Sequence, residues 1–181
     1  MVHDFSCGTR ALDFAGTLRA RRYEEPFEFL RTPSDLESWF VESGLLSTRT
    51  SASDGDLTSA LELREAIYAL IWSRLHARDM PQGAIDIVNA FAAHPSVRPV
   101  LEAGTWSAVG DVSQALSQLA REAIEIAGGD ETHLLRECGR PECTQIYLDH
   151  SRGRRREWCS MASCGSRMKA RAYRERRKAA V

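Results

Sequence analysis

Four cysteines in the C-terminal part of the chain have the spacing of a metal site. Two close pairs, each with four intervening residues, are separated by fifteen residues, in the order Cys138, Cys143, Cys159 and Cys164. A short loop lets both sulfurs of a pair converge on one ion, and the spacer returns the chain for the second pair. Four thiolates close a tetrahedral coordination sphere, so the pattern predicts one structural Zn2+ ion and disfavours a catalytic one. An iron site and redox-active thiols are the alternatives.

The residues around these cysteines predict the elements that would position them. Residues 144–149 are strand-like, 151–154 form a turn, and 155–158 would return as a second strand. A helix would follow Ser160 and run to about residue 178. A cysteine knuckle, a hairpin and a helix with ligands in its first turn form the order of a treble-clef zinc finger. A module of about 50 residues has little core, so the metal would supply most of its folding free energy.

The charge of the chain is distributed between two unlike parts. The formal net charge is −1, yet residues 1–130 carry 11 basic and 19 acidic side chains, whereas residues 131–181 carry 13 basic and 6 acidic ones. Such asymmetry is typical of proteins that contact nucleic acids or membranes. The predicted nucleic-acid contacts are the basic residues of the turn and of the last helix, namely Arg152, Arg154, Arg155, Arg156, Arg167, Lys169, Arg171, Arg174 and Lys178.

The first 130 residues predict a mainly helical domain with one short β-hairpin. Apolar residues at helical spacing and capping residues mark the helices. A hairpin is expected around Gly104, within residues 100–109. Gly128-Gly129 marks the predicted boundary between a domain at 1–130 and a finger at 131–181. The helices are expected over residues 8–21, from a capping box at 34–37 to Gly44, over roughly 57–77 with Asp56 as the cap, over 82–93 after Pro81, and from Asp111 to the glycine pair.

The C-terminal part closely resembles the CGNR-type zinc finger of bacteria. The matching residues are Cys138, Cys143, residues 147–149, Ser151-Arg152 and the run from Trp158 to Arg174. The N-terminal part resembles the ABATE domain in residues 12–15, 17–18, 35–36, 39, 44–46 and 63–67. The resemblance implies a family described as stress-induced transcription regulators, with a mainly helical N-terminal domain and a treble-clef finger that binds DNA. It also implies that the four finger cysteines are the zinc ligands.

Two positions depart from the pattern of that family. Ser166 and Gly16 each stand where the family has asparagine. Ser166 keeps a small hydrogen-bonding side chain, so we expect the fold of the finger to survive. Gly16 has no side chain, so we expect any polar contact of the asparagine to be lost.

Other patterns exclude several classes of protein. No apolar run approaches the ~18–20 residues that span a bilayer, and the N-terminal residues lack the basic and apolar segments of a secretory signal. We therefore expect a cytoplasmic protein with no membrane partner. The motifs of metalloproteases, phosphate-binding loops, serine hydrolases and zinc deaminases are absent from the sequence, so we do not expect an enzyme. His133 and His150, which flank the cysteines, are the only histidines that we consider as substitute metal ligands.

The sequence thus predicts a bacterial, nucleoid-associated regulator that binds duplex DNA. The N-terminal domain would sense a small-molecule or protein effector, or form a homodimer. Trp39, Trp72 and Trp106 are expected in the core, and a ligand pocket lined by them is the alternative. An RNA- or ribosome-associated zinc module and a protein-interaction adaptor are the other readings. In the adaptor, the acidic half would cover the finger until a signal releases it.

Overall fold

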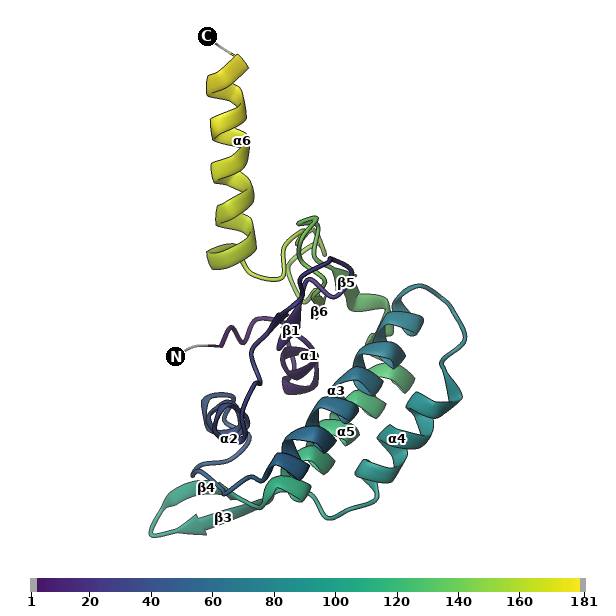
Figure 1. Ribbon diagram of the computed structural model, residues 1–181, viewed down its shortest axis with the longest axis vertical. Coiled ribbons are helices and arrows are strands. Elements are labelled where there is room, and N and C mark those ends of the chain that lie inside the picture. The colour runs from purple at the N-terminus through teal and green to yellow at the C-terminus, as the bar shows by residue number, and fades with distance from the viewer. Residues whose placement is uncertain (1–2, 180–181) are drawn as a thin grey trace.

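The helical part of the protein is built on α3, which spans Asp54–Leu75. The computed structural model describes residues 3–179 (Figure 1). α3 packs against α4 (Gln82–Ala92) and α5 (Val112–Gly128), which also pack against each other. These three helices confirm the predictions from apolar spacing. The buried face of α3 includes Leu63, Ile67 and Ile71.

Capping boxes fix where three helices begin, and two of them differ from prediction. In each box the cap side chain accepts from the N–H three residues on, and the side chain there accepts from the cap N–H. α2 (Pro33–Glu42) begins earlier than the box predicted at 34–37, because Pro33 suits the first helical position and Asp35 completes a box with the preceding threonine. In α3, Ser53 is the cap, and Asp56 is its partner three residues on. The three caps are Thr32, Ser53 and Asp111.

The segment predicted as one helix over 8–21 contains a short helix followed by a strand. α1 (Arg10–Ala15) ends where the hydroxyl of Thr17 donates to a carbonyl of its last turn at 2.7 Å. β1 (Leu18–Arg19) then pairs antiparallel with β2 (Phe27–Glu28). The prediction was wrong beyond α1, because the strand is stabilised by a partner segment that helical periodicity does not show.

The hairpin predicted within residues 100–109 is confirmed. β3 (Arg98–Glu102) pairs antiparallel with β4 (Thr105–Val109) through a two-residue turn. The turn residues Ala103 and Gly104 have φ of +48° and +79°. Positive φ at both central positions matches the right-handed twist of the strands that flank a tight hairpin.

The finger begins with a 3-10 turn, η1 (Asp130–Leu134), and a strand, β5 (Leu135–Glu137). β5 pairs antiparallel with β6 (Ile146–Leu148), so the predicted pairing of 144–149 with 155–158 was wrong. Residues 155–158 instead run beside the first cysteine loop, where a carbonyl of that segment accepts from the N–H of Gly139 at 2.8 Å. β5 already supplies the partner edge that β6 needs.

The last helix stands apart from the rest of the molecule. A wide helical turn, η2 (Met161–Gly165), leads into α6 (Ser166–Ala179), which projects away from the helical body (Figure 1). The predicted end near residue 178 is confirmed. In residues 3–179, no helix has the length and apolar character to cross a membrane. The fold is thus a mainly helical N-terminal part with short hairpins and a small four-cysteine finger, as predicted.

Candidate metal centre and basic helix

The four predicted cysteine side chains come together at the base of α6. Their Sγ atoms all lie within 4.8 Å of one another, and all four residues are buried. The sulfur of Cys159 lies 3.7 Å from that of Cys143 and 3.6 Å from that of Cys164. A disulfide would bring two sulfurs to about 2.05 Å, so these are separate thiols. Zn–S bonds of about 2.3 Å in a tetrahedron place the sulfurs about 3.8 Å apart, so the cluster fits one zinc ion.

Backbone hydrogen bonds close the two loops that present the sulfurs. The N–H of Cys138 donates to the carbonyl of Gln145 at 3.0 Å, and that of Cys143 donates to the carbonyl of Arg140 at 2.9 Å. In the second pair, the N–H of Gly165 donates to the carbonyl of Ser160 at 2.9 Å. The last ligand position therefore lies in the turn that starts α6, so the metal and the helix share their support.

The mutual contacts of the thiols prepare the cluster for a cation. Hydrogen bonds from Cys143 and Cys159 lower the pKa of Cys138 to about 7. Hydrogen bonds from the other three thiols, and from Arg140 at 3.8 Å, lower the pKa of Cys164. The pKa values of Cys143 and Cys159 are raised, first of all by their hydrogen bonds to Cys138, because a donor keeps its proton. Metal binding releases the remaining protons, since the thiolate is the ligand form.

The two histidines considered as substitute ligands lie outside the cluster. His133 is exposed, and its Nδ1 hydrogen-bonds to the carbonyl of Asp130 at 2.7 Å. His150 is also exposed. Among the described residues, the metal cluster contains only the four cysteines.

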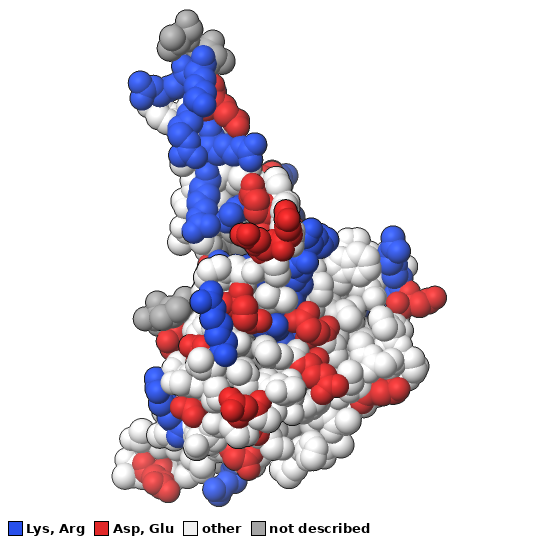
Figure 2. All heavy atoms as spheres, in the orientation of Figure 1, with Lys and Arg blue, Asp and Glu red and all other residues white. Residues whose placement is uncertain are grey.

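The surface of α6 is strongly basic. The helix carries seven basic residues and one acidic residue, Glu175. Figure 2 shows lysine and arginine side chains covering the projecting helix, while acidic side chains are scattered over the body below it. One basic residue is partly neutralised, because Arg171 lies 3.0 Å from Glu175 and 3.9 Å from Glu142. The predicted contact residues Arg167, Lys169, Arg171, Arg174 and Lys178 are all exposed.

The basic turn contributes three of its four predicted arginines to the surface. Arg156 instead turns inward, and it donates to the carbonyls of Ser6 and Trp158, both at 2.7 Å. Its guanidinium also lies 4.5 Å from the ring centre of Tyr147. Arg156 is half-buried and already engaged within the protein, because the carbonyls around it need a donor that a five-donor fork supplies, and its role as a nucleic-acid contact stays a prediction. The exposed three are Arg152, Arg154 and Arg155.

Two family models match the chain. Residues 8–130 match ABATE, described as "Putative stress-induced transcription regulator". The chain belongs to the ABATE family. Residues 135–177 match the CGNR zinc finger. No curated protein sequence matches the chain. With four buried thiols at the spacing of zinc ligands, this ABATE protein carries one structural zinc ion, and its families are regulatory and zinc-finger families rather than enzyme families.

Both positions that depart from the family pattern have a local role in this ABATE protein. The hydroxyl of Ser166 donates to the carbonyls of Ala162 and Ser163 at 2.8 and 3.0 Å, which supports the turn before α6. At Gly16, a Cβ would lie 2.5 Å from Nε2 of Gln145. That amide donates to the carbonyl of Gly16 at 3.1 Å, so a polar group from the finger occupies this space.

The three tryptophans do not meet in a pocket. Trp39 is buried against Phe14, which confirms the core prediction for it. Trp72 is partly buried and stacks on His76 with ring centres 4.4 Å apart. Trp106 is 61% exposed on β4, so the core prediction was wrong there. The hairpin that carries it extends from the body and buries little of its surface.

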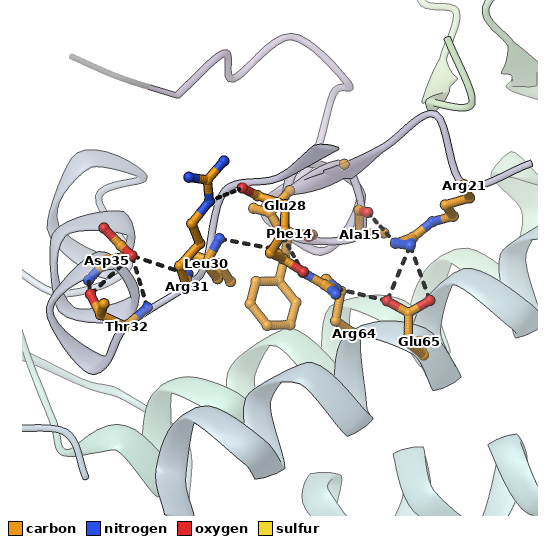
Figure 3. A network of polar contacts seen from close by, with 12 residues as sticks. Phe14, Ala15, Arg21, Glu28, Leu30, Arg31, Thr32, Asp35, Arg64 and Glu65 are labelled. Carbon is orange, nitrogen blue, oxygen red and sulfur yellow. Dashed lines mark hydrogen bonds and ion pairs between the residues drawn. The ribbon is translucent and has the colours of Figure 1, made fainter. Parts of the chain in front are cut away.

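A polar network around the buried Arg64 in the body was not predicted from the sequence (Figure 3). Arg64 is only 3% exposed, and its Nη1 donates to Oε1 of Glu28 at 2.7 Å while its Nε donates to Glu65 at 2.8 Å. Arg21 binds the same Glu65 at 3.0 Å. Burial lowers the pKa of Arg21 to about 10. A signal was present, since Arg64 falls on the apolar spacing of the helix, where a charged residue needs a partner.

Proposed function

We propose that this protein is a transcription regulator that binds duplex DNA through α6. The thiolates of Cys138, Cys143, Cys159 and Cys164 would hold zinc at the base of that helix. One observation carries the proposal: α6 projects from the body (Figure 1), and its described basic side chains are exposed. A free basic helix on a metal-anchored turn has the electrostatic character of a DNA contact.

The helical part has a separate role in this proposal. We assign residues 1–130 to a domain that senses a signal or mediates assembly, including a homodimer, and residues 131–181 to the finger. The end of the ABATE match at residue 130 supports this division. The regulator works in the cytoplasm on the nucleoid. Contacts across the division, such as the N–H of Leu148 donating to the carbonyl of Cys7 at 2.8 Å, provide a route from the body to the finger.

The physics of phosphate binding supplies the test. A contact between a basic side chain and a phosphate releases condensed counterions, so the logarithm of affinity falls with the logarithm of salt concentration by about 0.9 per contact. Such contacts carry no base specificity. A variant that loses two contacts on α6 should weaken binding to all duplex sequences and flatten the salt dependence.

The experiment compares two double variants of the zinc-loaded full chain. Arg171→Ala with Arg174→Ala removes two charges from α6, and Arg49→Ala with Arg98→Ala removes two exposed charges from the body. Fluorescence anisotropy with duplex DNA is measured across a salt series. We expect the α6 variant to lose about tenfold or more in affinity, with a slope smaller by about 2, and the body variant to match the parent.

The same measurement with single-stranded and duplex RNA separates the competing functions. Tighter binding to RNA than to duplex DNA would favour the RNA-associated module. An affinity for duplex DNA that does not change with salt concentration would contradict the DNA-binding role of α6. Equal losses of affinity in the two double variants would contradict it as well. Zinc content and the helical circular dichroism signal should be the same in all three proteins, because neither pair of arginines supports the metal cluster.

A further inference from the structure

A cavity of about 320 Å³ lies between the β1–β2 ribbon and the metal centre. This volume is within the range of about 300–1,000 Å³ that small-molecule sites occupy. One wall comes from the N-terminal part and the other from the finger, where Cys143 and Cys164 are among the lining residues. The side chains that determine its chemistry are Arg19, Phe27, Phe29, Arg140, Glu142 and Arg167.

The charged lining consists of three guanidinium groups and one carboxylate beside the metal centre, whose four thiolates and Zn2+ together carry a charge of −2, so the lining as a whole is close to neutral. Glu142 is paired with Arg140 at 3.0 Å, so this carboxylate is already engaged. Within residues 3–179, neither Arg19 nor Arg167 has a carboxylate partner, although Nε of Arg19 is enclosed by protein and does not face the open cavity. Two guanidinium groups without a carboxylate partner therefore line this space.

The other part of the lining is aromatic. Phe27 is 51% exposed, and its ring meets that of Phe29 edge to face with centres 4.7 Å apart. The guanidinium of Arg19 lies 5.1 Å from the centre of the Phe29 ring. The guanidinium of Arg31 also lies 5.4 Å from the centre of the Phe27 ring. The half-exposed ring still offers an apolar surface beside guanidinium groups that can donate hydrogen bonds to an anion.

We infer that this cavity binds a small organic anion, in which a carboxylate or phosphate group is attached to an aromatic or other planar ring. Arg19 and Arg167 hold the anionic group, and Phe27 and Phe29 pack on the ring. A DNA backbone phosphate fits less well, because a phosphodiester has no planar group to place on Phe27. The idea that this ligand is the signal of the regulator rests on the proposed function. The binding of the ligand in the cavity does not.

The position of Arg167 suggests what the ligand would change. Arg167 lies in the first turn of α6, whereas Arg19 and Phe27 belong to the two strands of the ribbon. An anion held by both parts restricts the direction of α6 relative to the body. Ligand binding would therefore be coupled to the affinity of α6 for DNA, and the coupling is reciprocal.

The test uses four probes on the zinc-loaded full chain without DNA. Benzoate and phenyl phosphate carry both a ring and an anionic group, inorganic phosphate carries only the charge, and benzyl alcohol carries only the ring. Isothermal titration calorimetry and two-dimensional NMR at millimolar probe concentrations measure the affinities. We expect benzoate or phenyl phosphate to bind at one site at least about tenfold more tightly than either control probe, because both walls of the cavity are used.

Variants locate the binding in the cavity. Arg19→Gln and Phe27→Ala should each weaken the better probe about tenfold or abolish its binding, while Arg49→Gln on the exposed surface of the body should leave it unchanged. The amide spectrum and the zinc content report whether each variant is folded. No binding of any probe, equal affinity for all four, or unchanged binding by Arg19→Gln would overturn the inference.

Competition with duplex DNA separates this inference from the proposed function. If DNA displaces the probe competitively and Arg19→Gln weakens DNA and probe equally, the cavity is part of the DNA interface and the inference is wrong. If the probe binds as expected but α6 does not bind DNA, the proposed function fails and the ligand site stands.

Discussion

α3 and α6 differ in how much of their surface is exposed to solvent. α3 has 22 residues, nine of them buried, and it packs against α4 and α5 along its length. α6 has 14 residues, and none of its described side chains is fully buried. An isolated helix of this length is marginal in water, because packing supplies most helical stability in proteins. α6 therefore depends on the turn that carries Cys164, whereas α3 depends on apolar contacts.

The strongest test of this contrast is loss of the metal. Cys159→Ser removes one of four ligands, and zinc binding contributes on the order of 10 kcal/mol in small zinc modules. We expect loss of zinc and loss of amide-exchange protection in η2 and α6, while the core of α3, α4 and α5 stays protected. Zinc content and hydrogen exchange followed by NMR measure the two effects.

The fifth cysteine provides the matched control. Cys7 is buried outside the cluster, so Cys7→Ala should keep one zinc ion per chain and a protected α6. Full protection of α6 in the zinc-free Cys159→Ser variant would mean that the helix does not rely on the metal.

A substitution in the helical body should give the second-largest loss of stability without changing the zinc content. Arg64→Gln removes a buried guanidinium that contacts the partly exposed carboxylates of Glu28 and Glu65, and losing hydrogen bonds to charged groups costs about 1.5–3 kcal/mol. Arg10→Gln breaks the more exposed pair with Glu122 and should cost under about 1 kcal/mol. Denaturant unfolding measures both. Equal losses, or loss of zinc from folded Arg64→Gln, would contradict the separation of the two regions.

Local patterns predicted the elements that local interactions stabilise. The apolar spacing of α3 and the cap at Asp111 were read correctly, and the spacing of the cysteines identified the metal cluster. Local patterns did not predict three features: the ribbon β1–β2, the pairing of β5 with β6, and the inward orientation of Arg156. Each of them depends on a partner from another segment. The cavity is the extreme case, since Arg19 and Arg167 come from opposite ends of the chain.

A third prediction tests the contact where the two regions meet. Gly16→Asn would place Cβ 2.5 Å from the amide of Gln145, which is buried and hydrogen-bonded. We expect a loss of about 2 kcal/mol in unfolding free energy, since crowding a packed site costs about 1–3 kcal/mol. Gln145→Ala should relieve the clash, so the double variant should be more stable than the sum of the single changes predicts, by about 1 kcal/mol.

The control for this cycle is a glycine with free space. Apart from its chain neighbours and the backbone of its own helix, nothing lies within 4 Å of a Cβ at Gly83 in α4, so Gly83→Ala should be neutral or slightly stabilising by the helix propensity of alanine. Strict additivity of the changes at positions 16 and 145 would mean that the amide of Gln145 does not restrict position 16.

The smallest predicted effect is a pH dependence at the same junction. Asp13 is 8% exposed, burial raises the pKa of its carboxyl to about 6, and its Oδ1 accepts from the N–H of Cys7 at 2.9 Å. Because the folded protein holds this proton more tightly than the unfolded chain, the stability it contributes is complete below about pH 4 and is lost as the pH rises through 6. Asp13→Asn keeps the acceptor oxygen and removes the charge. Its stability relative to the parent should increase by about 1 kcal/mol between pH 5 and pH 8, as measured by denaturant unfolding.

Asp35 should show a pH dependence of stability with the opposite sign, so it serves as the control for this test. Although its limited burial acts to raise the pKa of Asp35, hydrogen bonds from the hydroxyl and the N–H of Thr32 lower it. The stability from this cap is present above the unfolded pKa and is lost on acidification, so Asp35→Asn should be least favourable at neutral pH. If Asp13→Asn followed the same pH trend as Asp35→Asn, the carboxylate of Asp13 would be stabilising the junction between body and finger as an anion.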